Sequence, residues 1–257
     1  MQPKPQRTHP SAVHLVLAAH MDDESLGLGA WISAWNNRRE SVHVAFFTQG
    51  EPRNSGFFAH GDQAELYAAR RRTEAILAGR SLGIPLRQLH FGGFPDLELA
   101  RHLDPAWIWI MRLIQSLQPT SVYAPAYEGG HPDHDSINFL ASHLSDRPGR
   151  RRIWEYPLYT QANGRVLYRS FNRSQGLELV FPSRASDRRR KRRALSCYLS
   201  QRSTLQYFPA AEERIRALPR HDYSRPPVEP TVYELWGWPW KSKELCALWS
   251  RFHPARG

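Results

Sequence analysis

Cysteine and long apolar segments are scarce in this sequence, and each scarcity argues against a class of protein. The 257 residues include two cysteines, Cys197 and Cys246, which lie far apart without a Cys-x-x-Cys spacing. This pattern suggests neither a disulfide framework nor a cysteine-ligated zinc site. The only early apolar run, residues 13–19, is interrupted by His14 and followed by charged residues, so it is too short for a membrane span and unlike a cleaved signal. We therefore expect a cytoplasmic protein in which any metal has His and carboxylate ligands.

Positive charge is abundant and concentrated in one region. The formal net charge is +11, and 41% of the residues are hydrophobic, which suffices for one elaborated domain over residues 12–257. Residues 188–193 read Arg-Arg-Arg-Lys-Arg-Arg. Such a run fits an anionic substrate, a membrane surface, nucleic acid or a solvated helix face. No nucleic-acid motif or interleaved aromatic residue accompanies it, so nucleic acid is the partner with the least support. The sequence leaves the oligomeric state open, with a homo-oligomer as one alternative.

Strand-like and helix-like segments alternate through the first part of the chain. Strands are expected at residues 13–19, 42–48, 89–91 and 121–125, and helices at 25–36, 64–82 and 105–117, with a loop at 49–61. This alternation predicts an α/β fold, a Rossmann-like parallel sheet with helices on both faces, over residues 12–145. Residues 150–257, with shorter strand-like pieces at 153–159 and 177–181 and a basic helix at 186–201, would complete the sheet and the pocket. Residues 1–11 would form a flexible N-terminus.

Two clusters of His and Asp follow the first and fourth expected strands. Residues 20–24 read His-Met-Asp-Asp-Glu, and residues 131–135 read His-Pro-Asp-His-Asp. In a doubly wound sheet these strands are commonly neighbours, and ligands bind outside their carboxyl ends. Either cluster alone would also suit a structural histidine or a helix cap. Both clusters at one switch point predict catalysis, because two His and one Asp can bind zinc and leave a position for water.

Two other patterns accompany these clusters in the sequence. Gly27-Leu28-Gly29 follows the first strand, but the third glycine of a dinucleotide-binding fingerprint is absent and the preceding carboxylates would repel a pyrophosphate. Residues 236–240, Trp-Gly-Trp-Pro-Trp, would suit stacking on a sugar or packing of a terminal segment.

The paired clusters resemble the signatures of the LmbE-like or PIG-L deacetylases, which act on N-acetylglucosaminyl-phosphatidylinositol and in mycothiol and bacillithiol synthesis. The family's His-Pro-Asp-Asp-Glu stands at residues 20–24 with Met21 in place of proline, and its His-Pro-Asp-His stands at 131–134. Residues 71–83 are similar to its first long helix and 94–96 to its substrate-side loop. Residues 191–201 are similar to a later helix that often has His where this chain has Tyr198.

The resemblance implies hydrolysis of the N-acetyl group of an N-acetylglucosamine-type sugar or glycoconjugate, with Zn²⁺, or Fe²⁺, as cofactor. The implied metal ligands are His20, Asp23 and His134. Asp22 would be the general base, with Glu24 the next candidate. An alternative function is a binding protein for anionic surfaces or nucleic acid on a degenerate hydrolase scaffold.

The remaining site residues are expected to act on the substrate. His131 would be a protonated donor that stabilises the oxyanion, and Asp133 would orient it. Asp96 is a candidate substrate contact. Arg71 is another, although it would also suit an exposed position on its helix.

Overall fold

The computed structural model describes residues 12–51, 61–145, 151–208 and 212–254. The expected N-terminal tail, residues 1–11, and most of the expected loop at 49–61 lie outside these ranges. The strands are β1 (Val13–Ala18), β2 (Ser41–Thr48), β3 (Leu89–Phe94), β4 (Ser121–Pro125), β5 (Arg152–Tyr156), β6 (Tyr159–Ala162), β7 (Arg165–Tyr168), β8 (Glu178–Val180) and β9 (Arg214–Ala217). The α-helices are α1 (Asp23–Asn37), α2 (Gly61–Leu82), α3 (Leu103–Leu117), α4 (Pro132–Ser145), α5 (Ala185–Leu195), α6 (Arg202–Leu205), α7 (Val232–Leu235) and α8 (Ser242–Ser250). Short 3₁₀ turns span Leu86–Gln88, Leu99–Arg101 and Leu199–Gln201.

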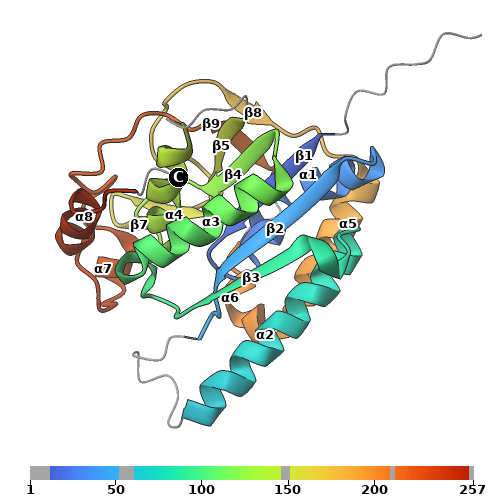
Figure 1. Cartoon of the computed structure of the whole chain (residues 1–257), viewed down its shortest axis with the longest axis horizontal. Coiled ribbons are helices and arrows are strands. Elements are labelled where there is room, and N and C mark those ends of the chain that lie inside the picture. The colour runs from blue at the N-terminus through green and yellow to red at the C-terminus, as the bar shows by residue number, and fades with distance from the viewer. Residues whose placement is uncertain (1–11, 52–60, 146–150, 209–211, 255–257) are drawn as a thin grey trace, which may run out of the picture.

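The sheet has seven strands in the order β3-β2-β1-β4-β5-β9-β8, and β6 pairs with β7 as a separate hairpin (Figure 1). The five strands from β3 to β5 are parallel. β9 is antiparallel to β5, and β8 is antiparallel to β9. The predicted α/β fold with a mostly parallel sheet is therefore confirmed, with the C-terminal part adding two antiparallel strands at one edge.

Helices cover both faces of the sheet because successive side chains of its central strands point to opposite sides. On one face Leu15, Leu17 and Phe47 join a core with residues of α3, α4 and α8. On the other face Val16, Val44 and Phe46 join a core with residues of α1, α2 and α5. No helix in the described ranges is long and apolar enough to cross a membrane.

The later elements differ most from their expected bounds. The expected strand at 153–159 is broken at Pro157 into β5 and β6, because proline cannot donate to a sheet ladder. The expected helix at 186–201 ends with α5 at Leu195. Helices α4, α7 and α8 and strands β7 and β9 were not expected from the sequence. The two strands span four residues each, too few for hydrophobic periodicity to identify them.

Candidate active site

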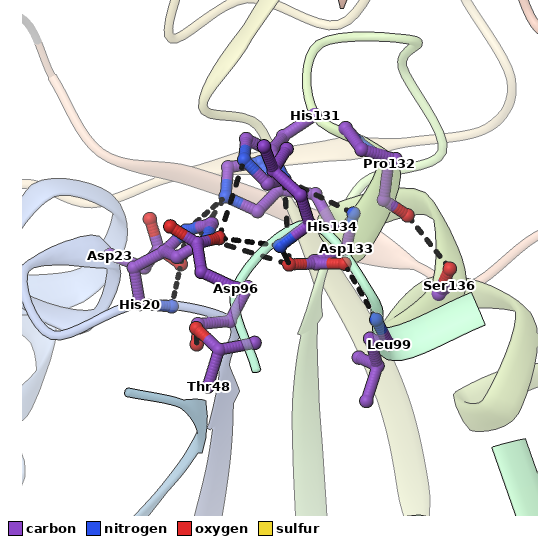
Figure 2. A network of polar contacts seen from close by, with 12 residues as sticks. His20, Asp23, Thr48, Asp96, Leu99, His131, Pro132, Asp133, His134 and Ser136 are labelled. Carbon is purple, nitrogen blue, oxygen red and sulfur yellow. Dashed lines mark hydrogen bonds and ion pairs between the residues drawn. The ribbon is translucent and has the colours of Figure 1, made fainter. Parts of the chain in front are cut away.

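The two His/Asp clusters lie side by side at the carboxyl edge of the sheet, where β1 and β4 are parallel neighbours (Figure 2). His20 lies two residues after β1, and His131 lies one residue before α4. The ring centroids of His20 and His131 are 4.3 Å apart, and those of His20 and His134 are 5.3 Å apart. The expected convergence of the clusters thus follows from strand order.

A tight turn carries Asp22 and Asp23 into helix α1. Asp22 has φ 156° and ψ −23°, outside the regions that L-residues ordinarily occupy. The Oδ2 atom of Asp23 accepts the backbone N–H of His20 at 2.9 Å and so closes the turn. Met21, in the position where proline is usual, is 2% exposed and packs in the core beneath the site. The turn is therefore held by burial of this side chain and by the Asp23 bond.

The second cluster is held by buried carboxylates and a close backbone approach. Asp135 Oδ1 accepts the backbone N–H groups of Glu128 and Gly129, each at 3.1 Å. A Cβ atom on Gly130 would lie 2.1 Å from the carbonyl oxygen of Tyr159, so only glycine fits directly before His131. These contacts fix the loop from which His131 and His134 project.

Three donor atoms form a compact triangle in this cluster. His134 Nε2 lies 3.3 Å from His20 Nδ1 and 3.3 Å from Asp23 Oδ2, and His20 Nδ1 lies 3.6 Å from Asp23 Oδ2. Tetrahedral zinc with bonds of about 2.0–2.1 Å holds its donors roughly 3.3 Å apart. The spacing and the two-nitrogen, one-oxygen donor set therefore fit zinc. A wider group, in which His131 joins His20 and His134, also has donor atoms within 4.8 Å of one another.

The charges around the triangle favour a cation. Burial opposes a charged His20, but Asp96, Asp133 and Asp23 outweigh it and raise the pKa of His20 well above its ordinary value. Burial likewise opposes a charged Asp23, but His134 and His20 outweigh it and lower the pKa of this carboxyl well below its ordinary value. The site thus stabilises positive charge beside a carboxylate that stays ionised.

Asp96, expected to contact substrate, contacts His20 in this structure. Its Oδ1 lies 2.9 Å from His20 Nε2 and accepts the backbone N–H of Leu97 at 2.8 Å. A carboxylate at Nε2 places the ring proton there and leaves the Nδ1 lone pair toward the triangle. Asp96 also lines the cavity, so a substrate contact stays a prediction beside this second role.

The contact between Asp133 and His131 differs from the expectation. His131 Nδ1 accepts the backbone N–H of Asp133 at 3.1 Å and makes no hydrogen bond with the Asp133 carboxylate. The carboxylate accepts the N–H groups of Leu97 at 2.8 Å and Leu99 at 3.1 Å, and it lies 4.0 Å from His131 Nδ1. Asp133 is fully buried, and its side chain holds the Asp96 loop while its backbone orients the imidazole.

This backbone bond determines which nitrogen of His131 carries a proton. Because Nδ1 accepts, the neutral ring carries its proton on Nε2, the nitrogen that lies 3.9 Å from Asp96 Oδ1. Burial and the neighbouring His20 and His134 lower the pKa of His131 well below its ordinary value. This shift favours a neutral ring that donates from Nε2, while the protonated donor expected from the sequence stays a prediction.

Asp22 is paired with a buried arginine at the edge of the triangle. Burial raises the pKa of Asp22 to about 6, while Arg71, whose Nη2 lies 3.5 Å from Asp22 Oδ1, counteracts this shift. The Arg71 side chain is 2% exposed, so the alternative of an exposed helix arginine is wrong. Its Nε and Nη1 atoms are buried without a partner among the described residues, which leaves donors for a ligand in the cavity.

Glu24, the second candidate base, points away from the cluster. Tyr198 donates its hydroxyl to Glu24 Oε1 at 2.7 Å, and burial raises the pKa of Glu24 to about 7. Glu24 does not belong to the lining of the cavity, whereas Asp22 does. In this chain Tyr198 therefore serves as the buried partner of Glu24.

A cavity of about 1010 Å³ opens over the cluster. Its lining includes all of the expected metal, catalytic and substrate-contact residues except Asp22's alternative Glu24 and the fully buried Asp133. Its outer lining comes from segments to which the sequence assigned no site: Tyr159, Val166, Tyr168, Ser203, Thr204, Tyr207 and Phe208. Trp236 and Trp238 line it too, while Trp240 is buried and donates its indole N–H to the Leu97 carbonyl. The tail thus both packs and borders the site, and the three tryptophans of residues 236–240 are the one sequence signal for it.

The basic run does not reach this cavity. Within α5, Lys191 is buried, and its Nζ donates to Glu213 Oε1 at 2.6 Å and to the Leu26 carbonyl at 2.7 Å. The arginines at 188–190 and 192–193 are exposed, and none of them lines the cavity. Lys191 is therefore a structural residue, and only the arginines can meet an anionic partner.

Known proteins share both the sequence pattern and the fold. The PIG-L family model, described as GlcNAc-PI de-N-acetylase, matches residues 15–145. A teicoplanin deacetylase in its zinc-inhibited form matches with a TM-score of 0.59 and 18% identity over 76% of this chain and 86% of that one. An N,N′-diacetylchitobiose deacetylase from Pyrococcus horikoshii matches with a TM-score of 0.52 and 16% identity over 80% and 83%.

The same fold also carries a different chemistry. A 4-carboxy-2-hydroxymuconate hydratase from Pseudomonas putida has a TM-score of 0.54 and 18% identity over 76% of this chain and 82% of that one. At such identities the likeness to solved structures establishes the fold alone. The family model, by contrast, spans about half of the chain and contains both His/Asp clusters. On that ground the chain belongs to the PIG-L family of GlcNAc-PI de-N-acetylases.

Proposed function

We propose that this protein is a zinc-dependent hydrolase that removes the N-acetyl group from an N-acetylglucosamine-type sugar or a glycoconjugate carrying one. The observation that carries the proposal is the triangle of His20 Nδ1, Asp23 Oδ2 and His134 Nε2 at 3.3–3.6 Å, on the floor of a cavity shared with Asp22 and His131. Family membership and the deacetylases of the same fold support this reaction class.

His20, Asp23 and His134 would hold the metal. A bound zinc ion supplies the Lewis acidity that makes a water molecule a competent nucleophile near neutral pH. Asp96 supports this role by keeping the proton of His20 on Nε2, 2.9 Å from its own Oδ1. The same ligands accept Fe²⁺, so the identity of the metal is part of the test.

Asp22 is positioned to take a proton from the attacking water. It lines the cavity beside Asp23, and its pKa of about 6 leaves it ionised at neutral pH but basic enough to accept a proton. Once protonated, it can return that proton to the leaving amine. Arg71 stabilises the ionised form through its Nη2 atom, 3.5 Å away.

His131 is positioned to stabilise the oxyanion. Its Nδ1 is occupied by the Asp133 backbone N–H, so Nε2–H is the donor that remains for the acetyl carbonyl oxygen. A fixed donor of this kind strengthens its bond as negative charge develops on that oxygen. The N–H groups of Arg71 that have no partner among the described residues would bind polar atoms of the sugar.

The direct test is metal content together with acetate release across a panel of N-acetylglucosamine conjugates. We expect about one metal ion per chain and acetate release that chelation abolishes and zinc restores. His20→Ala, Asp23→Ala and His134→Ala should each lose metal, because removal of one of three ligands leaves an incomplete shell. Full occupancy in all three variants would overturn the site. Salt-dependent binding to anionic surfaces with neither metal nor acetate release would instead favour the degenerate-scaffold alternative.

A further inference from the structure

We propose that the outer part of the active-site cavity binds an uncharged aromatic aglycone of the substrate. This inference rests on the proposed deacetylase function and adds to it the chemical class of the group attached to the sugar. Cavities of roughly 300–1,000 Å³ enclose whole drug-sized ligands. At about 1010 Å³, this cavity has room for much more than one N-acetylated sugar on its catalytic floor.

Aromatic rings continue from the catalytic floor to the mouth of the cavity. The Tyr159 ring lies 5.6 Å from His134 and 5.8 Å from Trp236, with which it is stacked at 23°. Phe208 lies 6.0 Å from Tyr159 and 4.8 Å from Tyr168. All of these centroid separations lie in the range in which aromatic rings attract one another. The wall can therefore accept a further ring.

Two indoles of the tail extend this wall to the catalytic histidine. Trp236 follows α7, whose start is fixed by a capping box between Thr231 and Glu234. Gly237 then takes φ 70°, which glycine adopts readily, and Trp238 follows. The Trp238 ring packs edge-on against His131 at 4.8 Å and against Trp236 at 5.4 Å. Trp236 is 47% exposed, so its ring remains available to a ligand.

Charge in the described lining is confined to the catalytic floor. The ionisable His, Asp and Arg residues are His20, Asp22, Asp23, Arg71, Asp96, His131 and His134. Every other described lining residue is neutral at pH 7, and the Nε2 atom of Gln201 already donates to Tyr67 at 2.6 Å. Among the described residues of this outer region an anionic group would find no cation. Hydroxyls such as those of Ser203, Thr204 and Tyr207 can meet polar substituents, while the rings of Tyr159, Tyr168, Phe208, Trp236 and Trp238 favour an uncharged aromatic ring.

The test compares two glycosides that differ in the aglycone alone, phenyl and methyl N-acetyl-β-glucosaminide. With zinc-loaded protein we expect kcat/KM for the phenyl glycoside to exceed that for the methyl glycoside by about tenfold, a gain of the size expected from stacking. Trp236→Ala should bring this ratio to within about twofold of one, whereas Trp236→Phe should keep most of it. Leu235→Ala, at a neighbouring exposed residue outside the cavity lining, should keep the full ratio.

Several results would overturn the proposal. If the phenyl-to-methyl ratio of kcat/KM is the same in wild type and Trp236→Ala, the aromatic wall does not recognise the aglycone. A higher kcat/KM for a disaccharide of N-acetylglucosamine than for the phenyl glycoside would make the outer part a sugar site. A higher kcat/KM for N-acetylglucosamine 1-phosphate would make it an anion site. Calorimetric binding of the two deacetylated glucosaminides separates this proposal from the reaction itself. A Trp236-dependent preference for the phenyl compound without acetate release from any substrate would support the aglycone site and contradict the deacetylase.

Discussion

His20 contacts Asp96 through one ring nitrogen and His134, another of the proposed metal ligands, through the other. Its Nε2 lies 2.9 Å from Asp96 Oδ1, while its Nδ1 lies 3.3 Å from His134 Nε2 (Figure 2). A proton on Nε2 leaves Nδ1 as the only nitrogen with a lone pair. Asp96 thereby links the loop after β3 to the proposed role of His20 as a metal ligand.

Removal of the Asp96 acceptor should weaken metal binding. We expect Asp96→Ala to lower zinc affinity by roughly 10- to 100-fold, the usual effect of losing a partner that orients a ligand. Asp96→Asn should lose less, because an amide oxygen can still accept from Nε2. Competition with a chelator measures both affinities, and Glu98→Ala, outside the cavity lining, is the control. Wild-type affinity in Asp96→Ala would restrict Asp96 to substrate contact.

Asp22→Asn should separate proton transfer from metal binding. Asp22 makes none of the short triangle contacts, so the variant should retain its metal. Turnover should fall roughly 10²- to 10⁴-fold, the range for loss of a positioned general base. Metal analysis and acetate release on one preparation provide the measurement. Turnover near the wild-type value would assign the base to another group.

The acid limb of the pH profile should respond to Arg71. The base must be ionised, so kcat/KM should rise as pH increases through the pKa of Asp22, about 6 without metal and lower beside a dication. Arg71 lowers that pKa, so Arg71→Met should move the limb to higher pH by roughly one unit or more. Arg70→Met, whose exposed side chain pairs with Glu74, should leave it in place. If the acid limb of Arg71→Met stays at the wild-type pH, Arg71 does not influence the pKa of the titrating base.

His131→Ala should lose transition-state stabilisation and keep the metal. We expect turnover to fall about 10²- to 10³-fold with little change in substrate binding, the usual loss for one oxyanion donor. Because burial keeps the His131 ring neutral, the shape of the pH profile should persist in the variant. Loss of the alkaline limb would show that the imidazolium is the donor after all. Loss of metal would make His131 a ligand.

The buried Lys191 and the exposed arginines beside it should behave differently in unfolding experiments. Lys191→Met removes the ammonium partner of the buried Glu213 carboxylate, which keeps the backbone N–H groups of Ala30 and Trp31 and the nearby charge of Arg169. Breaking a buried pair in this way costs about 3–5 kcal/mol in the free energy of unfolding. Arg190→Met should change it by no more than about 0.5 kcal/mol. Urea denaturation of both variants measures this contrast, and equal losses would make the whole run structural.

The sequence by itself determined the strands, their alternation with helices and the meeting of the two clusters. Residues 13–19 and 121–125 are apolar runs of strand length, and chain reversal through helices makes such strands parallel neighbours. Once β1 and β4 pair, the residues that follow them must share one edge of the sheet. The end of α2 at Leu82 was equally local, since Gly83 takes φ 89° there.

Only the tertiary structure decided how individual side chains are used. Periodicity does not show that Asp96 contacts His20, that the backbone of Asp133 contacts the His131 ring, or that Lys191 is buried within an exposed basic run. Each of these features depends on a contact with another segment of the chain. No local sequence pattern encodes the direction in which the side chain points to make that contact. The outer cavity wall has the same origin, because Tyr159, Phe208 and Trp236 meet only after three C-terminal segments pack against the core.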